Sequence, residues 1–129
     1  MPLWKKLALN WMGAGIWMAL IFYFSSIART NVSDIYILNF IFYKTLHVIE
    51  YAILYFLLFL GFCFTRELNL TRKEIFIYPL LVAILYAMTD EIHQTFVPTR
   101  EGTIRDVFID SGGIVLMYTY MKGRFYAKD

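Results

Sequence analysis

The feature that most constrains this chain is a run of 22 residues near its start, Leu7 to Ala28, that contains no charged side chain. A helix over this run rises 1.5 Å per residue and extends about 33 Å, close to the ~30 Å hydrocarbon core of a bilayer. A cleaved signal peptide is the alternative, because two lysines precede the run and Ser26-Ile27-Ala28 resembles a cleavage site. The apolar core of a signal peptide is shorter, at about 7–15 residues. The run therefore predicts a membrane-spanning helix.

The composition of the whole chain supports a membrane environment. Hydrophobic residues make up 60% of its 129 residues and aromatic residues 19%, with a mean hydropathy of +0.57, whereas globular proteins are about 45–50% apolar. A soluble domain of this size could not bury so much apolar surface. The apolar fraction also excludes disorder, and a single cysteine, Cys63, excludes a disulfide scaffold. The length predicts one domain over residues 1–129.

Three further apolar runs of 15 residues follow: Tyr51 to Thr65, Ile75 to Thr89, and Val107 to Met121, the last interrupted by Asp110. Each run alone spans only about 22 Å as a helix, and it crosses a bilayer only if its polar end enters the membrane. We therefore predict an all-α integral membrane bundle of four transmembrane helices, with spans at about 7–28, 44–65, 75–94 and 106–121.

The charges predict the orientation of such a bundle. With four spans, one side holds eight bases against three acids: Lys5, Lys6, Arg66, Arg72, Lys73, Lys122, Arg124 and Lys128 against Glu67, Glu74 and Asp129. The other side holds four bases against seven acids: Arg29, Lys44, Arg100 and Arg105 against Asp34, Glu50, Asp90, Glu91, Glu101, Asp106 and Asp110. The positive-inside rule places both termini in the cytoplasm. Thr71 with Glu74 three residues later also predicts a capping box at the third helix.

Polar residues within the predicted spans gather at the outer end of the bundle. A charge at the centre of a span costs about 2.5–3.5 kcal/mol, so such residues usually face a bundle interior or a wet cavity. Helical spacing places the polar residues of each span close together. The candidate site residues are Lys44, His47, Glu50, Tyr51, Asp90, Glu91, Gln94, Arg100, Asp106 and Asp110.

Smaller residues near this end complete the expected site. Ser25 and Ser26, at the outer end of the first span, can add hydroxyl groups. Gly112 and Gly113 follow Asp110 in the fourth span and are expected to allow close approach of another helix.

The segment 90–113 resembles the VanZ-like family of small bacterial membrane proteins. The family signature reads Asp-Glu-x-x-Gln-x-Phe-x-Pro-x-Arg, then Asp, then Asn or Asp, then Gly. This chain matches it at Asp90, Glu91, Gln94, Phe96, Pro98, Arg100, Asp106, Asp110 and Gly113. Ser25-Ser26 and the Lys44, His47 and Tyr51 pattern also fit the family. The chain departs from it at Thr99, where many members have glycine, and at Asp110, where asparagine is common.

The resemblance implies a location in the bacterial plasma membrane and a link to teicoplanin, a lipoglycopeptide acting at the outer face of that membrane. From it we expect the site to bind a lipid-linked cell-envelope precursor or a lipophilic glycopeptide, and to be associated with resistance to teicoplanin. The other expected partners are membrane lipids and further copies of the chain. No nucleic-acid signature is present.

Three alternatives for the polar residues stay open. In a structural role, Lys44, Arg100 and Arg105 would neutralise the five acids of the site and fix the helix register. In an enzymatic role, His47 or His93 would perform acid–base chemistry with a neighbouring carboxyl group on a lipid or envelope precursor. A proton-coupled transporter or channel is the third, although four short helices leave little room for a pore unless the protein forms oligomers.

No cofactor and no metal are expected from the sequence. A metal site could use Asp90, His93 and a carboxylate from another helix. The sequence lacks the spacing of zinc motifs such as His-Glu-x-x-His, which argues against it.

Overall fold

The computed structural model describes residues 1–28 and 30–126, with Tyr126 described by its backbone alone. The described chain is all helical: α1 (Leu3–Ser25), α2 (Tyr36–Phe64), the short 3₁₀ helix η1 (Arg66–Leu68), α3 (Arg72–Gln94) and α4 (Ile104–Tyr126). This confirms the predicted all-α class. Arg29, Lys128 and Asp129, which enter the charge comparison, lie outside the described residues.

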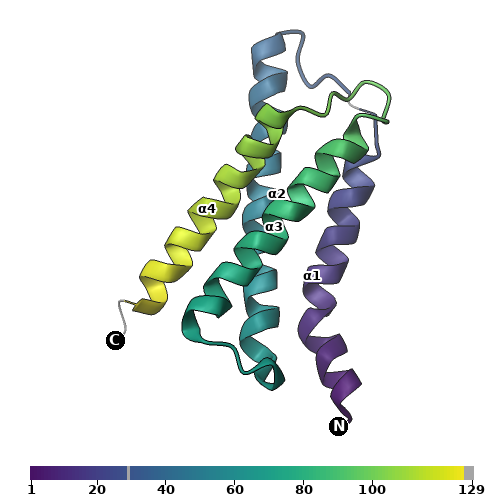
Figure 1. Cartoon of the computed structure of the whole chain (residues 1–129). Coiled ribbons are helices and arrows are strands. Elements are labelled where there is room, and N and C mark those ends of the chain that lie inside the picture. Colours follow the sequence, from purple (N-terminus) through teal and green to yellow (C-terminus); the bar gives the residue numbers. More distant parts are fainter. Residues whose placement is uncertain (29, 127–129) are drawn as a thin grey trace.

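The four long helices run alternately up and down, so the connections fall at two opposite ends of the bundle (Figure 1). The N-terminus, the turn containing η1 and the end of α4 lie together at one end. The connections 26–35 and 95–103 lie at the other end, which we call the polar end. This arrangement brings together the helix ends that carry the candidate site residues.

Three of the helices, α1, α2 and α3, are long and apolar enough to cross a membrane. The fourth, α4, also has 23 residues but is less apolar, because Asp106 and Asp110 lie in its first two turns. The side chains facing outward are largely hydrophobic, with Leu85 and Leu116 more than 60% exposed. Such a surface suits lipid rather than water.

The second helix is longer than its predicted span. It begins at Tyr36, eight residues before Lys44. The prediction used charge to place the boundary, but a charge limits a membrane span and does not end a helix. Asn39, in the added turns, accepts hydrogen bonds from the backbone N–H groups of Val32 and Ser33 at 2.8 and 3.0 Å. The helix extension therefore holds the 26–35 connection in place.

The half of the bundle away from the polar end has an aromatic core. We call this group, formed by Tyr55, Phe59, Phe76, Tyr118 and Phe125, the aromatic cluster. The ring centroids of Phe59 and Phe76 lie 5.1 Å apart, and those of Tyr55 and Tyr118 lie 6.1 Å apart. These spacings are in the range that favours aromatic pairs, so α2, α3 and α4 pack tightly here.

Polar groups at this end of the bundle have partners. The backbone N–H of Thr71 donates to Glu74 at 2.7 Å, and the Thr71 hydroxyl accepts from the backbone N–H of Glu74 at 3.3 Å, which confirms the predicted capping box. The Trp11 indole donates to the Thr65 hydroxyl at 3.0 Å and attaches α1 to the end of α2. The Tyr55 hydroxyl donates to the Phe76 carbonyl at 3.0 Å.

Only one of the two predicted close-approach glycines in α4 has that role. A Cβ atom at Gly113 would overlap the backbone carbonyl oxygen of Val48, so α2 and α4 touch through their backbones at this point. A Cβ atom at Gly112 would meet nothing within 4 Å. The prediction was wrong for Gly112, because successive helical residues point about 100° apart and only one of them can face α2.

Candidate functional site

The polar end contains a group of buried polar side chains between α2, α3 and α4. We call it the polar cluster: His47, Tyr51, Asp90, Glu91, Gln94, Asp106 and Asp110, all at most 6% exposed. Seven of the ten candidate site residues thus lie inside the bundle. Lys44 and Glu50 lie at its margin and Arg100 lies in the 95–103 connection.

Two basic residues of the polar end contact the same carboxylate. The Lys44 ammonium lies 2.5 Å from Asp106, and the exposed Arg105 lies 3.7 Å from the same carboxylate. Within the described chain, no lysine or arginine forms an ion pair with Asp90, Glu91 or Asp110. Direct ion pairing with lysine or arginine in the described chain is therefore uneven among these carboxylates, with Asp106 contacting both bases.

His47 lies between two carboxylates from different places in the fold. Its Nδ1 atom is 3.5 Å from Asp110 on α4 and 3.8 Å from Glu50, one turn further along α2. Helical spacing explains the second contact, because residues three apart are neighbours on a helix surface. The first contact depends on the close approach of α2 and α4 near Gly113.

Asp90 is held by one of its two carboxylate oxygens. The buried Tyr51 hydroxyl donates to Oδ2 at 2.8 Å, and the Gln94 amide lies 3.4 Å from the same oxygen. Gln94 also reaches the hydroxyl of Ser25, at 3.4 Å, and so connects the cluster to α1. The other oxygen, Oδ1, is buried and has no hydrogen-bond partner in the described chain.

Glu91 and Asp110 form a pair of carboxyl groups within hydrogen-bond reach of each other. The backbone N–H of Thr103 donates to Glu91 Oε2 at 3.2 Å, while Glu91 Oε1 and Asp110 Oδ2 are buried without a donor in the part of the chain described. An unsatisfied buried polar atom costs about 1–3 kcal/mol, and more if it is charged. Two carboxyl groups in such a position can share one proton or bind a cation.

Arg100 lies apart from these carboxylates and closes the end of α1. Its guanidinium donates to the backbone carbonyl oxygens of Ile27 and Phe24 at 3.0 and 2.8 Å, a usual role for arginine at a helix C-terminus. The preceding Thr99 has a positive φ of 67°, the conformation that glycine favours.

His93 also lies outside the polar cluster. Its ring stacks on Phe22 with centroids 4.4 Å apart, and Nε2 is 2.9 Å from the Ser26 hydroxyl. One residue before Gln94, it points about 100° away around α3, toward α1. Of the two histidines considered for acid–base chemistry, it is therefore His47 that lies in the polar cluster. Phe96, another signature residue, is 82% exposed.

A cavity of about 370 Å³ lies beside the polar cluster, between the end of α1, the first half of α2 and Arg100. Its lining residues are Phe24, Ser25, Ile27, Ala28, Thr30, Tyr43, Leu46, His47, Glu50 and Arg100. A second, more polar cavity of about 450 Å³ adjoins it, lined by Asn31, Tyr36, Asn39, Phe40, Tyr43, Lys44, Thr99, Glu101, Arg105 and Asp106.

Most of these lining residues were not among the candidate site residues predicted from the sequence. Tyr43, whose hydroxyl donates to the Thr30 carbonyl, lies in both cavity walls. The available signal was the absence of a helix breaker between Tyr36 and Lys44, which would have extended the second helix and placed Tyr43 one residue before Lys44 in it.

Comparison with known protein families identifies a relationship. A family model described as VanZ/LLP1 matches residues 10–125, which include nearly all of the four long helices. No curated protein and no solved structure shows a significant match.

Proposed function

The chain belongs to the VanZ/LLP1 family, and from this premise we propose that it binds the head group of an amphiphile at the polar end. The ligand class is a lipid-linked envelope precursor or a lipophilic glycopeptide such as teicoplanin. Binding would sequester the molecule at the membrane and give tolerance of teicoplanin where the protein is expressed.

The main support for this proposal is the cavity beside His47, because one of its walls is apolar and the other is charged, as an amphiphile requires. Phe24, Ile27 and Leu46 line it and are each more than 40% exposed, so they continue into the apolar outer surface. Glu50 and Arg100 supply opposite charges on the inner side. An acyl chain can lie against the first group while hydroxyl, amine or phosphate groups reach the second, and bidentate contacts suit arginine.

We also propose that α4 is a fourth membrane span. Asp106 and Asp110 face Lys44 and His47 within the bundle, so α4 need not expose these carboxylates to lipid. With four crossings and the positive-inside rule, the proposed topology has both termini in the cytoplasm of a bacterial cell and the polar end at the outer face.

The topology is testable with reporter fusions. A periplasmic alkaline phosphatase reporter inserted after Leu68 is expected to be inactive, and one inserted after Thr99 active. Activity at the first position with none at the second would reverse the orientation, and activity at both would contradict the crossing by α3.

Binding is tested with labelled teicoplanin and the purified full chain in nanodiscs. Leu46→Trp fills the cavity from its lipid-facing wall and is expected to weaken binding by about tenfold, or ~1.4 kcal/mol. The matched control is Leu85→Trp, since Leu85 is 61% exposed on α3 and does not line the cavity. Equal affinity in the two variants would contradict binding in this cavity.

A second candidate function is acid–base catalysis on the same amphiphile. It is favoured by His47, which lines the cavity and lies 3.5 Å from Asp110, as a general base and its carboxylate partner would. Incubation with labelled bacterial lipids distinguishes the two functions. Unchanged lipids across a range of pH and added metal ions would exclude catalysis on them and leave the binding function.

A further inference from the structure

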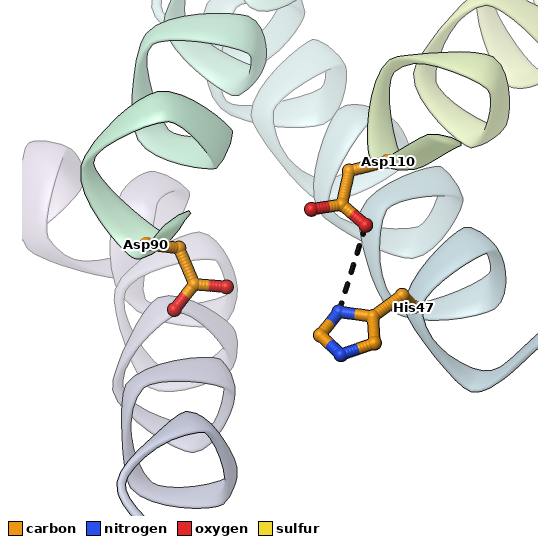
Figure 2. A group of neighbouring side chains, drawn as sticks. All are labelled: His47, Asp90 and Asp110. Atoms are coloured by element: carbon orange, nitrogen blue, oxygen red, sulfur yellow. Dashed lines mark ion pairs between the residues drawn. The ribbon is translucent and has the colours of Figure 1, made fainter. Parts of the chain in front are cut away.

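Three helices contribute one side chain each to a compact group of metal-binding type. His47 on α2, Asp90 on α3 and Asp110 on α4 each offer one ligand atom, and these atoms all lie within 4.8 Å of one another. Figure 2 shows the Asp90 carboxylate directed across the interior toward the facing pair of His47 and Asp110. The three residues come from separate parts of the sequence and meet only in the folded bundle.

Asp90 receives hydrogen bonds from the described chain on only one of its carboxylate oxygens, which leaves the other oxygen available to an ion. Tyr51 and Gln94 both approach Oδ2, which fixes the orientation of the group. Oδ1 stays buried with no donor in the described chain, and Asp90 as a whole is only 4% exposed. Metal-binding carboxylates are usually oriented in this way by partners outside the coordination sphere.

Asp110 supplies the second oriented oxygen. Oδ1 lies 3.5 Å from His47 Nδ1, whereas Oδ2 is buried without a donor in the described region, on a residue that is 1% exposed. Glu91 adds a further carboxyl group next to it. Lys44 and Arg105 are both engaged by Asp106, so no lysine or arginine ion pair compensates this group in the part of the chain described.

We propose that His47, Asp90 and Asp110 bind one divalent transition-metal ion, of the class represented by Zn²⁺ and Mn²⁺. One imidazole and two carboxylates suit these ions, whereas Mg²⁺ and Ca²⁺ prefer oxygen ligands alone. Zinc binds such ligands at about 2.0–2.2 Å, so the three side chains would move inward by roughly 1 Å. The ion would place positive charge directly beside Asp90 and Asp110, neither of which forms an ion pair with a lysine or arginine of the described chain.

The proposed ion has a consequence for the cavity. Three protein ligands leave at least one coordination position open on Zn²⁺, as in catalytic zinc sites. His47 is both a ligand and part of the cavity wall. If the amphiphile binds there as proposed, the open position lies beside its head group, and this step alone rests on the proposed function.

Metal binding is tested with the full chain in nanodiscs and without any amphiphile. The protein is stripped with a chelator, dialysed against Zn²⁺ or Mn²⁺ alone, and its metal content measured by mass spectrometry. We expect one ion per chain. Asp110→Asn is expected to weaken binding by more than about tenfold, and Tyr51→Phe, which releases Asp90, by about tenfold.

The matched control is Asp34→Asn, the same substitution at an exposed aspartate in the 26–35 connection. Visible absorption of bound Co²⁺ gives a second readout that reports an imidazole and carboxylate environment in any variant that remains folded. Less than a tenth of an ion per wild-type chain, or equal affinity in Asp110→Asn and Asp34→Asn, would overturn the proposal.

Labelled teicoplanin binding, measured separately in the presence of chelator, distinguishes this result from failure of the proposed function. Loss of metal binding with intact teicoplanin binding would overturn the metal site alone. Metal binding without teicoplanin binding would overturn the amphiphile function alone.

Discussion

The two ends of the bundle differ in whether their buried polar groups have hydrogen-bond partners. In the half that contains the aromatic cluster, the buried hydroxyls of Tyr55 and Thr65 both have hydrogen-bond partners. At the polar end, Asp90, Glu91 and Asp110 each keep a buried oxygen without a donor in the described chain. A hydrogen bond between membrane helices contributes only about 0.6 kcal/mol on average, which offsets little of the free-energy cost of burying such groups. A contribution to stability therefore does not explain why these groups are buried. The difference predicts that the aromatic cluster supplies most of the stability, and it fits the proposed ligand binding at the polar end.

The largest expected effect is on the stability of the aromatic cluster. Phe59→Ala removes a ring that is 1% exposed and contacts Phe76 and Phe125, so we expect a loss of about 3–5 kcal/mol in the free energy of unfolding. Reversible unfolding in mixed micelles measures it. Leu116→Ala is the control, because Leu116 is 67% exposed on α4. Similar losses in both variants would show that this end has no special role in stability.

The next effect concerns the contact that joins the two regions, at Gly113. Gly113→Ala places a methyl group on the Val48 carbonyl and separates α2 from α4, with an expected loss of about 1–3 kcal/mol or more. Because His47 and Asp110 meet near this contact, metal binding should weaken as well. Unfolding free energy and metal content are both measured.

Gly112→Ala gives the matched control one residue earlier. Its added methyl group meets open space, and alanine is a better helix former than glycine by about 1 kcal/mol. We expect equal or higher stability and unchanged metal binding. A loss as large as that of Gly113→Ala would contradict the packing described for α4.

The sequence was most informative where a single physical rule decides the structure. Apolar length identified the helices, and Thr71 with Glu74 identified the start of α3. Charge was less reliable for boundaries, because Lys44 limits a span while α2 begins at Tyr36. Helical periodicity showed which candidate site residues lie near each other on the same helix, but it could not show which of them contact residues of another helix. The pairing of Lys44 with Asp106, and the separation of His93 from the carboxylates, depend on how the helices are rotated in the bundle.

A smaller change in the free energy of unfolding is expected to have opposite signs at the two ends of the bundle. It tests directly whether the two ends have different roles. Asp110→Asn replaces an oxygen that lacks a donor with an amide that can donate to Glu91, so we expect a gain of about 1–2 kcal/mol in the metal-free protein. Tyr55→Phe removes a satisfied hydrogen bond in the other half and should cost about 1 kcal/mol. Unfolding measured in the presence of chelator compares them. Destabilisation by both variants would assign the polar cluster a structural role.

The smallest effect is expected in the loop that covers the polar end. Thr99 is a β-branched residue at a φ of 67°, where an L-residue other than glycine carries roughly 1–2 kcal/mol of strain. Thr99→Gly relieves this strain but adds about 0.4–1 kcal/mol of entropy to the unfolded chain. The net expectation is a gain of about 0.5–1 kcal/mol in the free energy of unfolding.

The control is Thr89→Gly, at an exposed position inside α3, which should instead lose a few tenths of a kcal/mol. Thermal unfolding of the two variants gives the comparison, and equal losses would show that Thr99 is unstrained. A gain would mean that the chain keeps a strained residue immediately before Arg100, whose guanidinium holds the end of α1 at the cavity wall.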